Sequence, residues 1–194
     1  VKAYNTNTVI NPIPVKYCKN INLANKLRKL CEDQIKDETI GIKAGGTGIQ
    51  ALKKLKEKEP FTAKVFKKRL VKSGQKVKIN QHTKGIEVEV YYFIKKSFFD
   101  FKGKVTKSNV SKFIKFMGPC FEIVGFRQRN KKFTYLGDIC GDFGFNIKFV
   151  VGRKTKFKKL NLNNLKTSLV SKKNGVKVNG NTNIVYINPL NSLR

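Results

Sequence analysis

The stretch GIEVEVYYF, residues 85–93, constrains this chain more than any other segment. Read as a β-strand, it places Glu87, Glu89 and Tyr91 on one face and apolar side chains on the other. The Cα atoms of the two glutamates would then lie roughly 6.5 Å apart, so that their carboxylates can converge. Two carboxylates on an interior face cannot both stay charged without a cation. The pattern therefore points to a hard divalent ion bound through oxygen, namely Mg²⁺, Mn²⁺ or Ca²⁺.

An edge strand whose glutamates face water would show the same pattern. A second E-x-E, at residues 57–59, lies among lysines at a helix end and is interpreted as solvent-exposed. The scarcity of acids favours a metal site at the first one. After Asp100 the only acidic residues are Glu122, Asp138 and Asp142. Glu122 lies in the apolar CFEIV, a costly place for a charge without a partner. Three carboxylates would leave about three positions of an octahedral ion for water or substrate.

The charge balance raises a second function class. The chain has 42 Lys and Arg against 12 Asp and Glu, a formal charge of +30, and such basic proteins are first suspected of binding nucleic acid. The lysines are dispersed, however, and no zinc finger, helix-turn-helix or aromatic RNA-binding motif accompanies them. Abundant Lys, Asn, Ile and Phe are also typical of a genome with AT-rich codons. A basic nucleic-acid-binding protein is kept as the less favoured alternative.

Length and cysteine usage limit the remaining classes. The 194 residues, 40% of them hydrophobic, are enough for one good core. No segment approaches the length of a membrane span and no secretory pattern opens the chain, so we expect no membrane partner. Four separated cysteines, at 18, 31, 120 and 140, form no C-x-x-C pair, which argues against zinc and disulfides. Free thiols suit a cytoplasmic protein.

Three helices are expected from apolar periodicity and capping residues. The first covers about 23–35, capped by Asn22, with an inner stripe of Leu23, Leu27, Leu30 and Cys31. The second covers about 48–58, with Thr47 and Gln50 at capping-box spacing. The third begins at Ser108 and buries Val110, Phe113, Ile114 and Met117.

Strands are expected between and after these helices. They cover 41–48 up to a glycine-rich turn, 61–79 around SGQ, 85–94, 119–126, the end of a loop at 138–152, and a hairpin with Asn174-Gly175 as its turn. Without repeats or linkers, residues 1–194 form one strand-rich α+β domain. Asn188 and Pro189 are typical of a helix start, so a helix would begin where the sequence stops. We interpret the chain as a fragment that is truncated at its C-terminus.

Six segments occur in an order and spacing that resemble a known group. They are GIKAGGT at 41, EPF at 59, IEVEVYYF at 86, FEIVGFR at 121, DICGDFGFNIKFVVG at 138 and NPLNSL at 188. They resemble the 2-keto-4-pentenoate hydratase and 4-oxalocrotonate decarboxylase group of the fumarylacetoacetate hydrolase superfamily, from about residue 20 onward. The resemblance implies a mixed β-roll with peripheral helices. Members continue past NPLNSL with a β-rich segment, which supports the interpretation of an incomplete domain.

The resemblance also implies site residues. The family binds Mg²⁺ or Mn²⁺ through positions that match Glu87, Glu89 and Glu122. Its G-x-K-x-G lysine matches Lys43, near the substrate's charged oxygens or in proton transfer. The remaining matches are Asp142 as a second catalytic group, and Arg127 and Asp138 as substrate-binding residues. His82, the one histidine, lies in a polar loop and is not assigned to catalysis.

The implied function is a metal-dependent lyase, a hydratase or decarboxylase of aromatic catabolism. A 2-oxo or 2-hydroxydienoate acid would chelate the metal, which stabilises the enolate as a proton moves. We class it as a carbon-oxygen lyase and expect a homo-oligomer. Three polar family positions are Phe61, Phe126 and Phe143 here. If these rings filled the pocket, the chain would be a catalytically degenerate relative, which is the second alternative.

Overall fold

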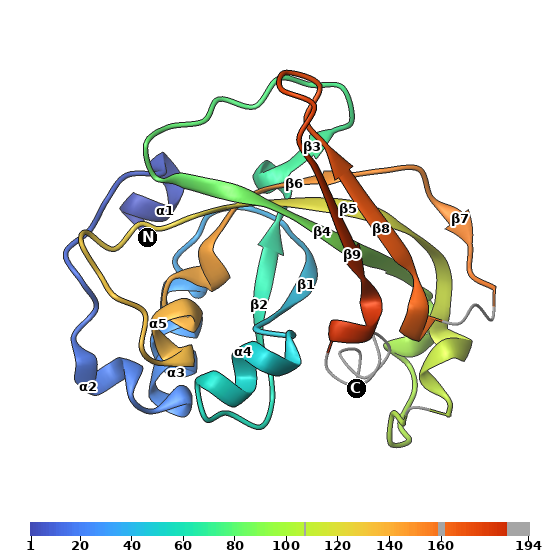
Figure 1. The fold of residues 1–194 in the computed structure, drawn as a ribbon. Coiled ribbons are helices and arrows are strands. Elements are labelled where there is room, and N and C mark those ends of the chain that lie inside the picture. The colour runs from blue at the N-terminus through green and yellow to red at the C-terminus, as the bar shows by residue number, and fades with distance from the viewer. Residues whose placement is uncertain (107, 159–161, 186–194) are drawn as a thin grey trace.

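The computed structural model describes residues 1–106, 108–158 and 162–185 (Figure 1). Its helices are short except for one: α1 (Lys2–Thr6), α2 (Val15–Cys18), α3 (Ile21–Asp33), α4 (Ile49–Lys54) and α5 (Leu136–Cys140). Its strands are β1 (Thr39–Gly45), β2 (Phe61–Phe66), β3 (Leu70–Lys72), β4 (Thr83–Ile94), β5 (Ile114–Gly125), β6 (Asn146–Val151), β7 (Thr155–Lys156), β8 (Lys166–Val170) and β9 (Lys177–Asn181). The expectation of a strand-rich α+β chain is confirmed.

The strands form one five-stranded mixed sheet and two separate pairs. The sheet has the order β3-β6-β5-β4, with β7 paired to the first part of β5. Only β3 and β6 run parallel in it; β4, β5, β6 and β7 pair antiparallel. The pairs β1–β2 and β8–β9 are antiparallel hairpin-like ribbons. In Figure 1 the helices α2, α3 and α5 gather beside β2, away from the long strands β4 and β5.

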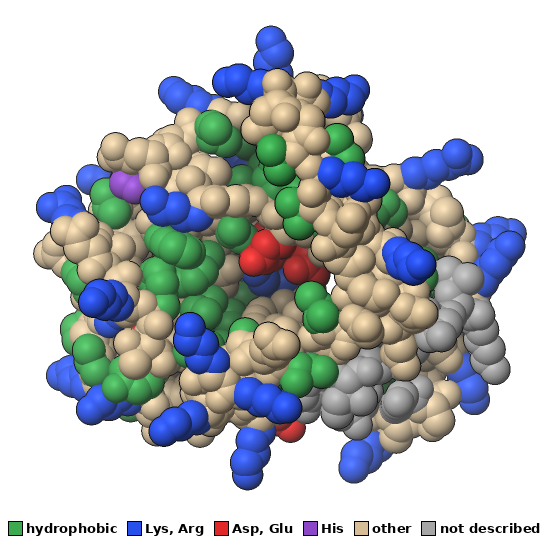
Figure 2. Space-filling view, viewed as in Figure 1, with side chains coloured by type: hydrophobic (Ala, Val, Ile, Leu, Met, Phe, Trp, Pro, Cys, Tyr) green, Lys and Arg blue, Asp and Glu red, His purple; other side chains and the backbone are tan. Residues whose placement is uncertain are grey.

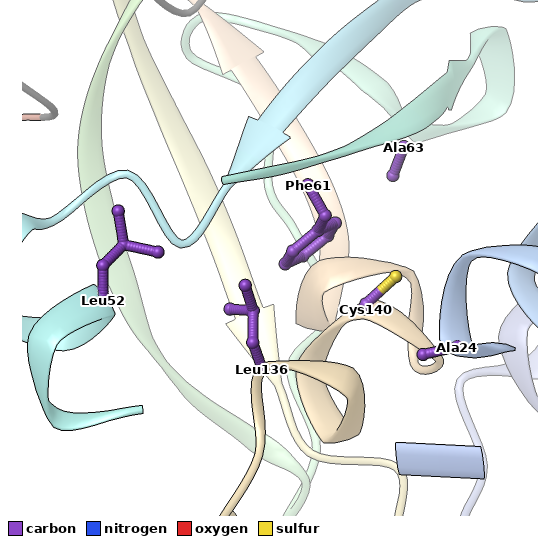
Figure 3. Close-up of a cluster of buried hydrophobic side chains, with 6 residues drawn as sticks. All are labelled: Ala24, Leu52, Phe61, Ala63, Leu136 and Cys140. Carbon is purple, nitrogen blue, oxygen red and sulfur yellow. The ribbon is translucent and has the colours of Figure 1, made fainter. Parts of the chain in front are cut away.

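The hydrophobic core joins the helices to β2. Figure 3 shows one buried cluster between α3, α4, α5 and β2, made by Ala24, Leu52, Phe61, Ala63, Leu136 and Cys140. A second cluster packs the N-terminal helix against the end of β2 and contains Tyr4, Ile35, Phe66 and Phe143. All four cysteines are free thiols, as the sequence indicated. No helix of the described residues is long and apolar enough to cross a membrane.

Helix α3 differs from its expected cap and inner face. Asn20 caps it, since its side-chain oxygen accepts hydrogen bonds from the N–H groups of Asn22 and Leu23. Its buried residues are Ala24, Arg28 and Glu32, whereas Leu23 and Leu30 are 43% and 55% exposed. The predicted apolar stripe is therefore wrong at these two leucines.

A buried ion pair explains why the inner face of α3 differs from the predicted one. Arg28 Nη1 lies 2.5 Å from Glu32 Oε1, and the same oxygen accepts the backbone N–H of Lys64 in β2 at 2.8 Å. Glu32 thus links the helix to a strand that needs an acceptor for its N–H. A hydrogen-bonded carboxylate can lie in the interior, whereas an isolated carboxylate could not. Glu32 therefore faces inward, and Leu30, which the apolar periodicity placed on the inner face, is exposed.

Two other expectations about helices are corrected. Helix α4 begins after Gly48 with no side-chain cap, so the Thr47–Gln50 capping box does not form. The helix expected from Ser108 is only the 3-10 turn η3 (Val110–Phe113), and β5 starts at Ile114. Val110, Phe113, Ile114 and Met117 are buried as expected, but β5 pairs with β4 along almost its whole length. Strand pairing over twelve residues outweighs local helical periodicity.

The hairpin with Asn174-Gly175 at its turn is confirmed, with Gly175 at φ 69°. Residues 138–140, expected as loop, belong to the short helix α5. Asn188 and Pro189, the expected start of a last helix, lie outside the described residues.

The inward face of α3 can be tested by two substitutions. Glu32→Gln leaves the buried Arg28 without its counter-charge, so the free energy of unfolding should fall by roughly 3 kcal/mol. Leu30→Ala, on the exposed face, should change it by less than about 1 kcal/mol. Urea unfolding followed by circular dichroism measures both. A larger loss for Leu30→Ala than for Glu32→Gln would restore the stripe that the sequence predicted.

Candidate metal centre

Three glutamates meet on one face of the main sheet. In the antiparallel pair of β4 and β5, Glu87 lies directly opposite Glu122, and strand alternation places Glu89 on the same face as Glu87. One carboxylate oxygen from each of the three lies within 4.8 Å of the other two. Figure 2 shows acidic side chains at the bottom of a hollow near the centre of the molecule. The structure thus brings together the three carboxylates singled out in the sequence.

The spacing and the donor set fit a divalent cation. Oxygens that bind one ion at about 2.0–2.6 Å lie at most about 5 Å apart, and the observed limit of 4.8 Å falls within that range. All three donors are carboxylate oxygens, which select hard ions such as Mg²⁺, Mn²⁺ or Ca²⁺ over zinc. Glu122 is buried and Glu87 is exposed, so the group faces inward on one side and solvent on the other.

The carboxylates destabilise one another's charge. Burial raises the pKa of Glu89 to about 7, and the charges of Glu122 and Glu87 add to that shift, while Lys43 opposes it. Burial also raises the pKa of Glu87, again with Glu122 as the second cause. One ammonium group does not offset three carboxylates. A bound divalent ion would favour the ionised form of all three.

Lys43 and Asn146 hold Glu122 in place. Lys43 on β1 reaches across to β5, where its Nζ lies 2.5 Å from Glu122 Oε1, and it also donates to the carbonyl of Gly144 at 3.1 Å. The side-chain amide of Asn146 donates to the same Glu122 oxygen at 3.2 Å. Both bonds use Oε1, which leaves Oε2 for a cation. Asn146 was missed in the sequence, although its polar side chain at the start of an apolar strand was a usable signal.

Gly144 has a conformation that matters for Lys43. Its φ is +64°, and a Cβ there would lie 3.0 Å from Lys43 Nζ and 3.2 Å from the Phe61 ring. A side chain at this position would therefore displace the lysine. The flanking residues Phe143 and Phe145 also have positive φ, at 54° and 62°, which is costly for bulky side chains. This strained turn presents the Gly144 carbonyl to the ammonium.

Arg127 and Asp142 form an ion pair with each other and do not join the three glutamates. Arg127 Nε donates to Asp142 Oδ1 at 2.7 Å, and its backbone N–H donates to Asp142 Oδ2 at 3.1 Å. Another guanidinium N–H donates to the carbonyl of Asn146 at 2.8 Å. The side chains of Arg127 and Asp142 are only 1% and 3% exposed. Burial raises the pKa of Asp142 and the Arg127 charge opposes it. In this arrangement the pair supports Asn146 and offers neither group to a substrate.

Asp138 also lies in the interior. It is fully buried and accepts the N–H groups of Thr134 and Tyr135 at the start of α5, while Lys131 lies 3.1 Å from its other oxygen. The structure therefore places this predicted substrate-binding residue in a helix cap. Among the predicted residues, only Lys43 joins the three glutamates.

The three phenylalanines at polar family positions pack in different places. Phe143 stacks on Tyr4 at 4.2 Å, in the second core cluster. Phe126 packs with Phe133 and Phe145 at 4.6 and 4.7 Å. Phe61 belongs to the core of Figure 3, and its ring lies against Gly144. Two of the three replacements thus strengthen packing away from the carboxylates.

Comparison with solved structures identifies the fold. The structure of 4-oxalocrotonate decarboxylase from Pseudomonas putida G7, complexed with magnesium and adipate, matches with a TM-score of 0.72 and 17% identity. The same enzyme complexed with calcium and acetate matches with a TM-score of 0.75 and 17% identity. The chain has the fold of 4-oxalocrotonate decarboxylase. The matches cover 97% of this chain and 73% and 72% of the decarboxylase chains. No protein-family model and no curated protein matches the sequence. The likeness to this decarboxylase that the sequence segments suggested is confirmed for the fold, whereas the β-roll and the truncation stay predictions.

Metal binding can be tested at Glu122. Glu122→Gln removes one of the three carboxylate charges of the candidate metal site, so the affinity for Mn²⁺ or Mg²⁺ should fall by at least tenfold. The matched control is Glu59→Gln, which changes the exposed E-x-E at 57–59 and should leave affinity unchanged. Isothermal titration calorimetry measures both. Equal affinities for the Glu122→Gln and Glu59→Gln variants would exclude these carboxylates as the ion's ligands.

The support role of Arg127 gives a separate prediction. Arg127→Gln leaves the buried Asp142 unpaired, and the free energy of unfolding should fall by roughly 3 kcal/mol. The exposed Arg129 supplies the control, since Arg129→Gln should be close to neutral. Denaturant unfolding reports the difference. A fully stable Arg127→Gln variant with impaired ligand binding would instead support a direct substrate contact.

Proposed function

We propose that this chain carries the site of a metal-dependent lyase that acts on a 2-oxo or 2-hydroxydienoate acid. Glu87, Glu89 and Glu122 would hold Mg²⁺ or Mn²⁺. The observation that carries the proposal is the meeting of these three carboxylates within 4.8 Å of one another, with Lys43 bonded to one of them. The fold shared with a decarboxylase complexed with magnesium supports it. A bound divalent ion would supply Lewis acidity to a chelating 2-oxo acid.

Lys43 is the residue best placed to act on the substrate. Its ammonium lies at the edge of the carboxylate group, 2.5 Å from Glu122 and 6.0 Å from the centre of the Phe149 ring. A positive charge there would stabilise the negative charge that develops on the substrate's oxygen. An ammonium can also give up a proton and take it back. Phe149, opposite Glu122 on β6, would bound the hollow on an apolar side.

Asp142, Arg127 and Asp138 take indirect roles in this proposal. The Arg127–Asp142 pair positions Asn146 by binding its carbonyl, and Asn146 in turn binds Glu122. Hydration is the reaction that we propose for the site, because the hollow is open to water on the side of Glu87. Loss of carbon dioxide from the same chelated acid is the second candidate, favoured by the likeness to a decarboxylase.

The two alternatives are less well supported. Phe126 and Phe143 pack away from the carboxylates, which weakens the case for a degenerate site. In Figure 2 the basic side chains are spread around the face rather than gathered in one stripe. This distribution does not favour a specific nucleic-acid surface.

The activity test follows the absorbance of a 2-hydroxydienoate acid with Mg²⁺ and again with EDTA. Turnover should require the metal and should be lost in Glu89→Gln, but not in the control Glu59→Gln. Lys43→Gln should lower kcat by about 100-fold or more while metal affinity is kept, because the lost group acts on the substrate. Turnover that persists in EDTA would refute the metal mechanism. Metal binding without any turnover would favour the degenerate relative.

A further inference from the structure

The buried charges in the described part of the chain are paired, with one exception. Seven charged side chains there are buried, namely Arg28, Glu32, Arg69, Glu122, Arg127, Asp138 and Asp142. Within the described residues, six of these seven have an oppositely charged group within 4.0 Å; Arg69 has none. A buried charge without a counter-charge is costly, so Arg69 requires an explanation.

The contacts of Arg69 are with neutral groups. Its side chain is 6% exposed and lies in the 3-10 turn η1 (Lys67–Arg69). One terminal nitrogen donates to the carbonyl of Ile147 at 3.2 Å, and the other donates to the carbonyl of Tyr4. The guanidinium carbon lies 3.8 Å from the centre of the Tyr4 ring. These contacts orient the group, and no carboxylate of the described residues forms an ion pair with it.

A pocket of about 460 Å³ lies beside Arg69, and half of the residues that line it are cationic. Lys36, Lys68 and Lys148 line it together with Arg69, and Asp37 supplies the one carboxylate. Lys148 donates to the carbonyl of Lys68 at 2.6 Å, and its ammonium forms no ion pair with a carboxylate of the described residues. Burial lowers the pKa of Lys148, and the Arg69 charge lowers it further.

Asp37 offsets only part of these charges, since it is a single carboxylate beside four cations, and the backbone holds both of its oxygens. One accepts the backbone N–H of Glu38 at 2.9 Å and the other that of Lys68 at 3.0 Å. Four cations thus face one carboxylate that is held by the main chain. In a lysine-rich protein, exposed cations do not by themselves indicate a binding site. This pocket differs from the rest of the basic surface because Arg69 is buried and Lys148 is half-buried.

We propose that this pocket binds a small phosphate-bearing anion, held by Lys36, Lys68, Arg69 and Lys148. Several lysine and arginine donors around one cavity suit the oxygens of a phosphate group, which accept charge-assisted hydrogen bonds. Lys148 and Phe149 are neighbours on β6 and point to opposite faces of the sheet. Phe149 lies opposite Glu122, so the pocket is on the other face from the carboxylates. The anion would act apart from the lyase site.

The test is a calorimetric titration of the full chain with inorganic phosphate. The buffer contains EDTA to exclude metal phosphate complexes, and potassium chloride keeps the ionic strength constant. One phosphate should bind per chain. Lys148→Gln should weaken binding roughly tenfold through loss of a charge-assisted contact, and Lys68→Gln should do so to a similar extent. Lys166→Gln, at an exposed lysine of β8, is the matched control and should leave binding unchanged.

Arg69→Gln could lose stability through its Tyr4 contacts, so the two lysine variants carry the test. Equal binding by Lys148→Gln, Lys68→Gln and Lys166→Gln, or binding without a defined stoichiometry, would show attraction by the net charge alone and overturn the proposal. A second titration with glycerol phosphate distinguishes a phosphorylated metabolite, which would bind more tightly, from free phosphate. Glu89→Gln should bind phosphate normally, so this proposal and the lyase proposal can fail independently.

Discussion

The mutual repulsion of three carboxylates is the constraint on which the rest of this structure depends. The pairing of β4 with β5 places Glu87 opposite Glu122, and the charge of Glu122 raises the pKa of both Glu87 and Glu89 in addition to burial. Lys43 offsets part of that charge from a different sheet, and the strained turn at Gly144 accepts its remaining hydrogen bond. The turn whose carbonyl binds the Lys43 ammonium therefore holds two phenylalanines at an energetically costly positive φ.

Strand β6 connects this group to the rest of the molecule. Asn146, at its start, binds Glu122 with its side chain and Arg127 with its carbonyl. The next carbonyl, of Ile147, accepts from Arg69. Consecutive residues of one strand thus support a carboxylate site on one face and a cationic pocket on the other. The alternation of a β-strand allows two opposite charge environments to lie on opposite faces of one sheet.

Local patterns predicted those parts of the structure in which one face of an element is clearly apolar or a turn requires particular residues. The alternation in GIEVEVYYF gave the strand and the shared face of its glutamates, and Asn174-Gly175 gave the hairpin. Prediction failed where a polar contact between distant segments decided the outcome. Glu32 lies inward because it binds Arg28 and a backbone N–H of β2, and no periodicity of α3 shows that partner. The second half of the segment 110–117 is strand because β4 pairs with it.

The sequence by itself determined the ingredients of the candidate site: scarce acids, two of them at strand spacing, and a third in an apolar strand. Those features follow from covalent order and alternation, which need no tertiary information. Only the tertiary structure decided which of the other polar residues belong to it. Lys43 and Asn146 join Glu122, whereas Asp138 caps a helix and Asp142 pairs with Arg127 in the interior. The physical reason is that a buried charge must find a partner, and the partner is chosen by distance in space rather than by distance along the chain.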